Sequence, residues 1–239
     1  MSTPRTARAL ARETLTQEIL DAARARLRSD GPAGLSLRAV ARDVGMVSSA
    51  VYRYFPSRDA LLTRLLIDSY GELGEAVERA ETEVAREDTG GRWLAACRAL
   101  RTWCMDRPGD FALLYGTPIP GYAAPQDTVE PATRVIQVLA RIVGDAYADG
   151  ARAVPAPRGG AGTDATVAGA RDFVVEHGLA RSGLATESVV RTLMAWSQLF
   201  GTVSFELFGH LAGSVTDPAR WYDEVAIRLA ADLGIQLRV

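Results

Sequence analysis

The sequence predicts an all-α fold, with an N-terminal three-helix head joined by a long helix to a larger helical body. Three observations carry this prediction. Apolar residues recur at helical spacing along most of the chain. No segment of strand length alternates between apolar and polar residues. The stretch SLRAVARDVGMVSSAVYRYF, residues 36–55, is typical of two short helices folded across a glycine turn, which is a helix-turn-helix.

The first helix of this pair has one apolar face, whose spacing of i, i+3, i+4 and i+7 is carried by Leu37, Val40, Ala41 and Val44. Ser36 precedes the helix, where its hydroxyl could cap the first free amides. Gly45 follows it and is expected to end it.

The second helix is expected to bury Val51 and Phe55, which are four residues apart. This orientation turns Ser49, Tyr52 and Arg53 outward. A face of small, aromatic and basic side chains can lie in the major groove of DNA, where hydroxyls and a guanidinium reach base edges and phosphates.

The run from Leu15 to Leu66 resembles the DNA-binding domain of TetR-type bacterial transcriptional regulators. The motifs that carry the resemblance are LSLRAVARDVG, SSAVYRYF and PSRDALL. It implies that Tyr52 and Arg58 hold phosphates, while Arg38 and the start of the recognition helix read bases. The expected DNA-binding residues are Ser36, Arg38, Ser48, Ser49, Tyr52, Arg53, Tyr54 and Arg58.

One position departs from the family pattern, because Val47 stands where a capping Ser or Thr is usual. We therefore expect Ser48 to cap the recognition helix, which leaves it less free to read a base. The alternative to a DNA-binding head is a helical hairpin inside a larger bundle, in which outward tyrosines and arginines would serve no core.

Length and charge agree with a DNA-binding head on a larger body. The chain has 239 residues, 48% of them hydrophobic, enough for a large core. Residues 1–60 hold ten arginines against six acidic residues, a net charge of +4, whereas the whole chain has −2. Only the N-terminal quarter therefore suits a polyanion. We expect residues 1–60 to be the DNA-binding domain and residues 61–239 to be an effector-binding and dimerisation domain.

Several classes of function find no support in the sequence. It has no signal-peptide core and no run of eighteen apolar residues, so we expect a cytoplasmic protein without a membrane partner. Cys97 and Cys104 are interpreted as buried side chains, with a redox switch as the alternative. His177 near a helix end is more typical of a carbonyl contact than of a catalytic base. No catalytic motif is recognisable, so we expect no enzyme, cofactor or metal site.

The N-terminal segment, residues 1–12, carries Arg5, Arg8 and Arg12 without an acidic residue. It could be an arm that reaches the DNA backbone or minor groove, or a frayed tail. An amphipathic helix follows over residues 15–27, and the GPAG turn at residues 31–34 ends it. Beyond the head, Ser57 is expected to cap a long helix that continues to about residue 87 and could transmit a conformational change. Gly71 and Gly74 weaken that helix and could allow a bend.

Further helices are predicted at residues 93–105, 128–152, 166–182, 186–211 and 217–234, with a short helical piece at 108–116 and a loop at 153–166. The stretch AWSQLFGTVSFELFGHL is apolar on nearly all sides, so it needs two buried surfaces. One surface is expected to meet its own core and the other a second subunit, through the stripe Trp196, Leu199, Phe200, Val203 and Leu207. The stretch resembles a TetR subgroup named for a Trp, His, Gly pattern, with Phe200 at the histidine's place.

Together with the family resemblance, the pattern predicts a homodimeric, ligand-responsive regulator that a small apolar effector releases from a palindromic, inverted-repeat operator. That the regulator is a repressor is what the resemblance implies. The expected dimer surface lies on residues 196–207 and 221–233. The aromatic side chains expected around the effector are Trp93, Trp103, Phe111, Tyr115, Tyr122, Trp196 and Phe200. For each of them, ordinary core packing is an equally good interpretation. The alternative function is a constitutive or architectural DNA-binding dimer with a filled body and no effector.

Overall fold

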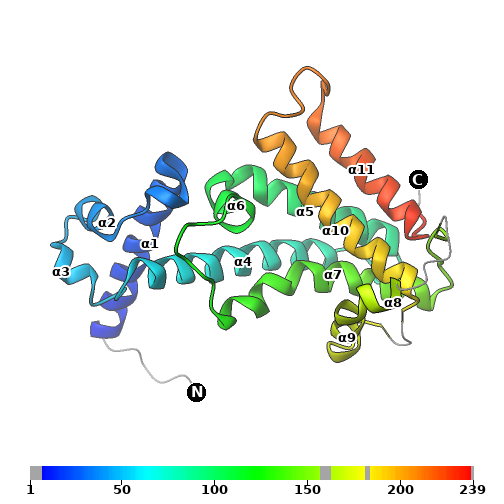
Figure 1. Cartoon of the computed structure of the whole chain (residues 1–239), viewed down its shortest axis with the longest axis horizontal. Coiled ribbons are helices and arrows are strands. Elements are labelled where there is room, and N and C mark those ends of the chain that lie inside the picture. Colours follow the sequence, from blue (N-terminus) through cyan, green and yellow to red (C-terminus); the bar gives the residue numbers. More distant parts are fainter. Residues whose placement is uncertain (1–6, 157–162, 181–183, 238–239) are drawn as a thin grey trace. The chain divides into compact units, whose positions relative to one another are not determined.

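The computed structural model describes residues 7–156, 163–180 and 184–237. Every regular element within these ranges is helical, which confirms the predicted all-α class (Figure 1). The elements are α1 (Ala7–Gly34), α2 (Leu37–Asp43), α3 (Ser48–Val51), α4 (Arg58–Thr82), α5 (Thr89–Asp106), α6 (Pro108–Tyr115), the 3-10 turn η1 (Gln126–Thr128), α7 (Val129–Ala148), α8 (Thr163–Thr166), α9 (Ala168–Glu176), α10 (Thr186–Leu207) and α11 (Pro218–Asp232).

The chain folds into two compact units. The head unit holds the residues up to Gly71 together with Arg107–Ala132. The body unit holds Glu72–Asp106 together with the residues from Thr133 onward. The head unit therefore includes α6, although the 35 residues of Glu72–Asp106, which precede this helix in the sequence, belong to the body unit. The domain boundary expected between residues 60 and 61 stays a prediction.

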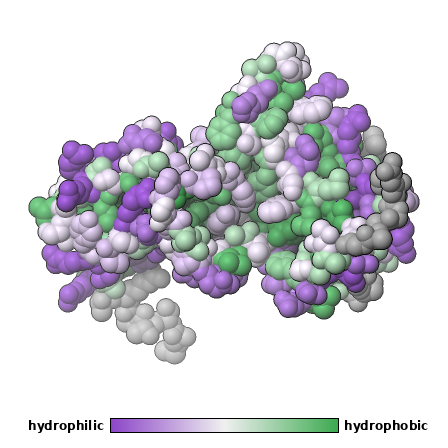
Figure 2. Space-filling model, viewed as in Figure 1, coloured by the Kyte–Doolittle hydropathy of each residue, from purple (hydrophilic) through white to green (hydrophobic). Residues whose placement is uncertain are grey.

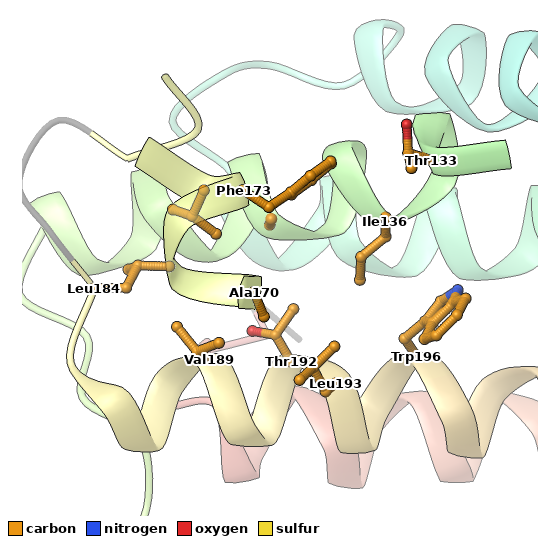
Figure 3. Close-up of a pocket in the computed structure, with 11 residues that line it drawn as sticks. Thr133, Ile136, Ala170, Phe173, Leu184, Val189, Thr192, Leu193 and Trp196 are labelled. Atoms are coloured by element: carbon orange, nitrogen blue, oxygen red, sulfur yellow. The ribbon is translucent and has the colours of Figure 1, made fainter. Parts of the chain in front are cut away.

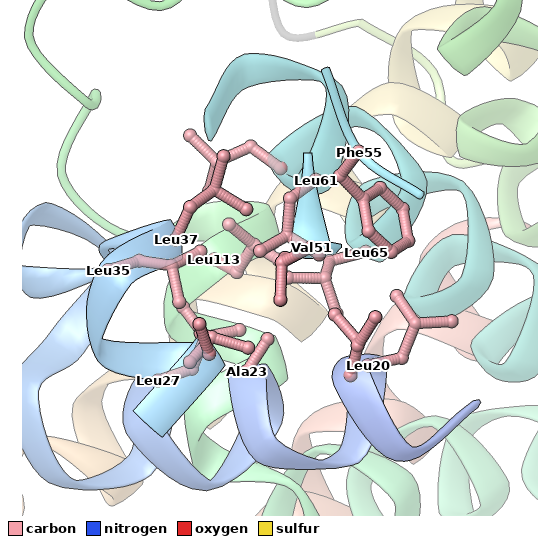
Figure 4. Packing of buried hydrophobic residues seen from close by; sticks show 14 of the residues in the cluster. Leu20, Ala23, Leu27, Leu35, Leu37, Val51, Phe55, Leu61, Leu65 and Leu113 are labelled. Carbon is pink, nitrogen blue, oxygen red and sulfur yellow. The ribbon is translucent and has the colours of Figure 1, made fainter. Parts of the chain in front are cut away.

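The core of the head unit joins α1, α2, α3 and the first turns of α4 (Figure 4). Val51 from α3 and Phe55 beyond it are buried, as their spacing predicted. They meet apolar side chains of the other helices, among them Leu20, Ala23, Leu27, Leu37, Leu61 and Leu65. Leu113 from α6 belongs to the same cluster. The short helices α2 and α3 are thus held by burial of their apolar faces rather than by their own helical stability.

Two glycines end the helices of the head. Gly31 has a φ of 70°, which breaks the helical path at the predicted GPAG turn. Gly45 has a φ of 66° and separates α2 from α3. The first helix starts at Ala7 rather than near Leu15, so its first two turns extend beyond the expected start.

The helix caps differ from the sequence expectation. Ser36 occupies the N-cap position of α2, but its side chain makes no capping hydrogen bond. The expectation that Ser48 would cap the recognition helix is wrong: Val47, with extended backbone, is the N-cap residue and Ser48 is the first residue of α3. Ser57 caps α4 as expected, because its hydroxyl accepts a 3.0 Å hydrogen bond from the amide of Ala60.

Helix α4 is continuous through both glycines, and its residues as far as Gly71 belong to the head while those from Glu72 belong to the body. Gly74 has a packing role, since a Cβ there would come within 2.8 Å of the Arg134 side chain from α7. Arg134 in turn donates a 2.9 Å hydrogen bond to Glu78. The close approach explains why a residue of low helix propensity stands inside this helix.

The body unit is held by an apolar core and by a buried ion-pair network. Arg92 on α5 is fully buried and donates a 2.7 Å hydrogen bond to Glu81 and a 2.8 Å hydrogen bond to Asp145 of α7. The Arg92 guanidinium also donates to the carbonyl of Arg86 at 3.1 Å. Because the buried guanidinium is matched by two carboxylates and a carbonyl, burial of its charge is compatible with a stable body.

The later helices are shorter than their expected ranges, and part of the expected loop is helical. Residues 157–162 of that loop lie outside the described residues, whereas Thr163–Thr166 forms α8. Three residues of the apolar stripe expected to meet a second subunit, Leu199, Phe200 and Val203, are buried within one chain. The other two, Trp196 and Leu207, are half-buried, and the dimer surface expected on this stripe stays a prediction. The apolar side chains that α10 exposes are on its other side, and they include Met194 and Phe205.

Candidate nucleic-acid interface and apolar pocket

The helix-turn-helix exposes the residue types that the sequence placed there. Arg38 on α2 is exposed, and so are Ser49, Tyr52 and Arg53 on α3 and the turn after it. Tyr52 exposes 46% of its surface although it is a large aromatic residue. These four side chains belong to the head unit. Ser49, Tyr52 and Arg53 point away from Val51 and Phe55, which are buried, and Arg38 is exposed on α2. The geometry suits a face that meets phosphates and base edges.

Three other expected residues are only partly exposed. Ser36 and Ser48 are half-buried at the starts of the two short helices. Tyr54 is half-buried beyond α3, where the guanidinium of Arg12 lies over its ring at 5.5 Å from the ring centre. This contact brings the first turns of α1 beside the recognition helix, which the sequence did not predict.

Arg58 contacts backbone carbonyls of the head unit, which the family resemblance did not imply. Its Nε donates a 2.9 Å hydrogen bond to the carbonyl of Leu35, and its Nη2 donates at 3.0 Å to the carbonyl of Pro32. The side chain therefore ties the start of α4 to the turn between α1 and α2. In this arrangement Arg58 stabilises the position of α2 through its Nε and Nη2 donors. The phosphate contact that the family resemblance implies for Arg58 stays a prediction.

The body unit contains an apolar pocket of about 180 Å³ between α7, α9 and α10 (Figure 3). Phe173 of α9 and Trp196 of α10 provide its two aromatic side chains, and Thr133 and Thr192 provide its hydroxyl groups. The remaining lining residues are Ile136, Ala140, Ala170, Val174, Leu184, Val189 and Leu193. Among the residues that the structure describes, the lining contains no charged side chain.

Of the seven aromatic residues expected around an effector, Trp196 alone lines this pocket. Trp93, Trp103 and Phe200 are buried in the body. The indole nitrogen of Trp93 donates a 2.9 Å hydrogen bond to the carbonyl of Ala226, which fixes it as a core residue.

Phe111, Tyr115 and Tyr122 belong instead to the head unit. The rings of Phe111 and Tyr115 lie 5.6 Å apart, centre to centre. The hydroxyl of Tyr122 lies 2.9 Å from that of Thr63, and burial raises the pKa of Tyr122. These three side chains pack within the head unit and do not line the pocket of the body.

The pocket residues that sequence reasoning missed follow helical spacing. On α9 they are Ala170, Phe173 and Val174, and on α10 they are Val189, Thr192 and Leu193, next to the expected Trp196. Each set forms one face at i, i+3, i+4 spacing. The spacing could have indicated a buried face on each helix. It could not have indicated that the two faces leave a space between them, because that depends on how the helices pack.

A second concave surface of the body lies on the outer side of α10 and α11. It has a volume of about 720 Å³ and includes three large exposed apolar side chains, Met194, Phe205 and Trp221. Green hydrophobic side chains are visible over α10 in Figure 2, whereas the helix-turn-helix region carries many purple hydrophilic ones. Exposed aromatic and Met side chains in one concave patch are typical of an interaction surface.

The two cysteines and His177 lie in ordinary structural surroundings. Cys97 and Cys104 are buried, and burial raises the pKa of both thiols, which favours the protonated form over the thiolate. His177 Nδ1 lies 2.8 Å from the carbonyl of Phe173, the contact expected at a helix end. Among the described residues, no group of three or more potential metal-ligating side chains comes together, and no helix is long and apolar enough to cross a bilayer.

An exposed basic helix-turn-helix in one unit and an apolar pocket in a second helical unit define the chain as a helix-turn-helix transcriptional regulator. Residues 19–65 match the family described as bacterial regulatory proteins, tetR family. Residues 93–229 match the family described as tetracyclin repressor-like, C-terminal domain. The chain belongs to the TetR family of bacterial transcriptional regulators, a class of DNA-binding regulators rather than of enzymes. The finer resemblance to the Trp, His, Gly subgroup stays a prediction.

Relatives that the chain matches over most of their length are consistent with this assignment. The chain is 38% identical over 228 residues to the HTH-type transcriptional regulator Rv1816 of Mycobacterium tuberculosis (strain ATCC 25618 / H37Rv), with 94% of each chain covered. Among solved structures, it is similar to regulatory protein SCO4313, with 30% identity, a TM-score of 0.73 and coverage of 96% of this chain and 100% of that one. The transcriptional regulator FadR from Bacillus subtilis, solved with stearoyl-CoA, shares the fold at 13% identity and a TM-score of 0.56, over 90% of this chain and 98% of that one.

Proposed function

We propose that this protein is a homodimeric repressor that binds an inverted-repeat operator and is released from it by a small apolar effector. The observation that carries the proposal is the separation of two surfaces: a basic helix-turn-helix in the head, and an uncharged pocket in the body. Helix α4 is continuous from one unit into the other, which offers a physical route for coupling.

In this proposal the residues on the exposed face of the helix-turn-helix have two different roles. Tyr52 and Arg53 hold phosphates, while Arg38 and Ser49 contact base edges in the major groove. Ser36, Ser48 and Tyr54 border this face and are less accessible. The division of roles rests on side-chain type and exposure, since a guanidinium and a small hydroxyl can both reach base edges.

The homodimer is proposed to form through the outer sides of α10 and α11. The groove with Met194, Phe205 and Trp221 leaves apolar surface in water that a second copy would cover. A two-fold dimer places two recognition helices about 34 Å apart or somewhat more, so its DNA site would be an inverted repeat.

The proposed effector is neutral, apolar and small. An engineered apolar cavity of about 150 Å³ in another protein binds benzene, and the pocket here is of similar size at about 180 Å³. Its described lining residues offer two threonine hydroxyls and no charged side chain, so a ligand with a phosphate or carboxylate would lose hydration without compensation from them. By this argument the effector would differ from the stearoyl-CoA found with FadR.

The alternative of a constitutive DNA-binding dimer requires a body without a ligand site. The apolar pocket between α7, α9 and α10 favours a sensor over that alternative. Release of DNA then requires that the effector bind the non-operator conformation more tightly. A difference of ~2.7 kcal/mol between the two conformations would lower operator affinity about a hundredfold.

The proposal is tested by selecting bound DNA from a random pool and then screening neutral aromatic and aliphatic compounds for release of the selected DNA, measured by fluorescence anisotropy. An inverted repeat among the selected sequences and release by an uncharged compound would support it. Arg38→Ala should then cost ~1 to 3 kcal/mol mainly at one base pair of the operator, whereas Arg53→Ala should weaken all sequences about equally. Selection of sequences without two-fold symmetry would contradict a dimer on an inverted repeat.

A further inference from the structure

A concave site in the head unit lies between the first turns of α1 and the end of the recognition helix. Its volume is about 390 Å³. The α1 residues that line it are Arg8, Ala11, Arg12 and Leu15, and the residues facing them are Met46, Ala50, Arg53 and Tyr54. The lining therefore includes three arginines and, among the described residues, no acidic side chain.

The orientation of this site follows from helical geometry. The four α1 residues are spaced i, i+3, i+4 and i+7, so they form one face of the helix. Leu15 is half-buried at the inner end of this face, while Arg8 and Arg12 are exposed at its outer end. Because α1 starts at Ala7, both arginines are held on regular helix beside α3.

The arginines of the site are available for a ligand. Within the described residues, Arg8, Arg12 and Arg53 are in no ion pair, whereas Arg26, elsewhere on α1, donates 2.6 and 2.9 Å hydrogen bonds to Asp43. Arg12 is oriented by the ring of Tyr54, 5.5 Å away. A stacked guanidinium keeps its edge donors free for an anion while its face is held by the aromatic ring.

We propose that this site binds a backbone phosphate of the DNA, next to the bases that α3 faces. The proposal rests on the DNA-binding function proposed above and adds Arg8 and Arg12, which lie outside the helix-turn-helix, to the residues that hold the duplex. Phosphates project from the duplex, so a concave site with three guanidinium groups suits a phosphate better than a base edge. Such a contact fixes the register of α3 and adds affinity without reading sequence.

The test uses the full-length Arg8→Gln, Arg12→Gln double variant and a control, Arg64→Gln. Arg64 lies on α4 of the same unit and pairs with Asp68, so the control also loses positive charge. All three arginines are substantially exposed, and thermal unfolding verifies that the variants remain folded. DNA affinity is measured as a function of salt concentration, on selected and on unrelated sequences.

The double variant should weaken binding to both kinds of DNA by about the same factor, at least tenfold. For each phosphate that a protomer no longer neutralises, the slope of log K against log salt should become shallower by about 0.9, which is about 1.8 per dimer. Arg12→Lys, which keeps the charge, should retain most of the slope. A double variant indistinguishable from Arg64→Gln would overturn the proposal.

Ethylation of individual phosphates on the DNA provides a second measurement. Modification of one phosphate in each half-site should weaken the original protein and have no further effect on the double variant. Inorganic phosphate is compared with chloride at equal ionic strength for its effect on the thermal stability of the original protein. If phosphate stabilises the original protein, but the same DNA ethylations weaken the double variant as weaken the original protein, the site binds a free anion and the DNA assignment is wrong. Failure of the original protein to bind any DNA would be a different result, since it would remove the proposed function itself.

Discussion

The hydroxyl of Ser69 on α4 donates a 2.7 Å hydrogen bond to the carboxylate of Asp110 on α6, and both side chains are buried in the head unit. The Nε of Arg24 on α1 lies 3.7 Å from the same carboxylate oxygen. One buried carboxylate therefore meets side chains of two other helices, each far from it in the sequence. A buried polar contact of this kind favours one relative position of α1, α4 and α6 over others.

Removal of this hydrogen bond should destabilise the head unit. We expect Ser69→Ala to lower the free energy of unfolding by about 1 kcal/mol. Asp110→Ala should lower it by about 2 to 3 kcal/mol, because this substitution leaves the Ser69 hydroxyl buried without its acceptor and removes the charge that faces Arg24. Urea denaturation followed by circular dichroism measures both values. In the double variant the effects should be less than additive. Fully additive effects would mean that the two side chains do not interact in solution.

Arg58 should act by positioning the head rather than by holding a phosphate. Lysine at this position keeps the charge but lacks the fork that reaches the carbonyls of Leu35 and Pro32 together. We expect Arg58→Lys to lower the free energy of unfolding by about 1 to 2 kcal/mol, and Arg58→Ala to leave the salt slope of DNA binding unchanged. If Arg58→Ala instead makes the slope shallower by about 1.8 per dimer, the role implied by the family resemblance is correct.

A side chain that fills the pocket of the body should abolish the response to an effector. Ala170 on α9 lines the pocket, so in Ala170→Phe the ring would occupy space otherwise open to a ligand. We expect this variant to bind operator DNA normally and to remain bound at effector concentrations that release the original protein. Val175→Phe is the matched control, because Val175 lies on the same helix and is 69% exposed. Equal release of both variants would show that the effector binds elsewhere.

A charge placed in the groove of α10 and α11 should dissociate the dimer. Phe205 is 54% exposed in the single chain and lines this groove. If a second copy covers it, Phe205→Glu would bury an unpaired carboxylate and weaken dimerisation by at least about 2 kcal/mol. Sedimentation at micromolar concentration should find the original protein as a dimer and Phe205→Glu as a monomer, while Val175→Glu should remain dimeric. An original protein that sediments as a monomer would exclude this interface.

Local sequence patterns were sufficient to predict the class of fold and the helix-turn-helix. Val51 and Phe55 turn inward, and Gly31 and Gly45 end helices, because helical spacing and positive φ are properties of a few neighbouring residues. Ser57 caps α4 for the same reason. The cap at Ser48 was predicted wrongly by one position, since the backbone of Val47 already occupies the N-cap conformation without a side-chain hydrogen bond.

The surroundings of each buried aromatic side chain could not be deduced in this way. Trp93 and Trp196 both lie within long helices, yet the indole of Trp93 donates a hydrogen bond to a carbonyl 133 positions away while Trp196 borders a pocket. The same limit applies to the apolar stripe of α10, because periodicity indicates that a face is buried but does not identify the helix that covers it.

The sequence by itself thus determined the helical class, the two helices of the helix-turn-helix and the outward face they carry, because these depend on contacts between residues close along the chain. The tertiary structure alone decided that α6 joins the head through Asp110, that Arg58 binds carbonyls, and that Phe173 and Thr192 line the pocket. These features depend on the packing of helices distant in sequence, where the fit of many side chains at once sets which faces touch and where a space remains.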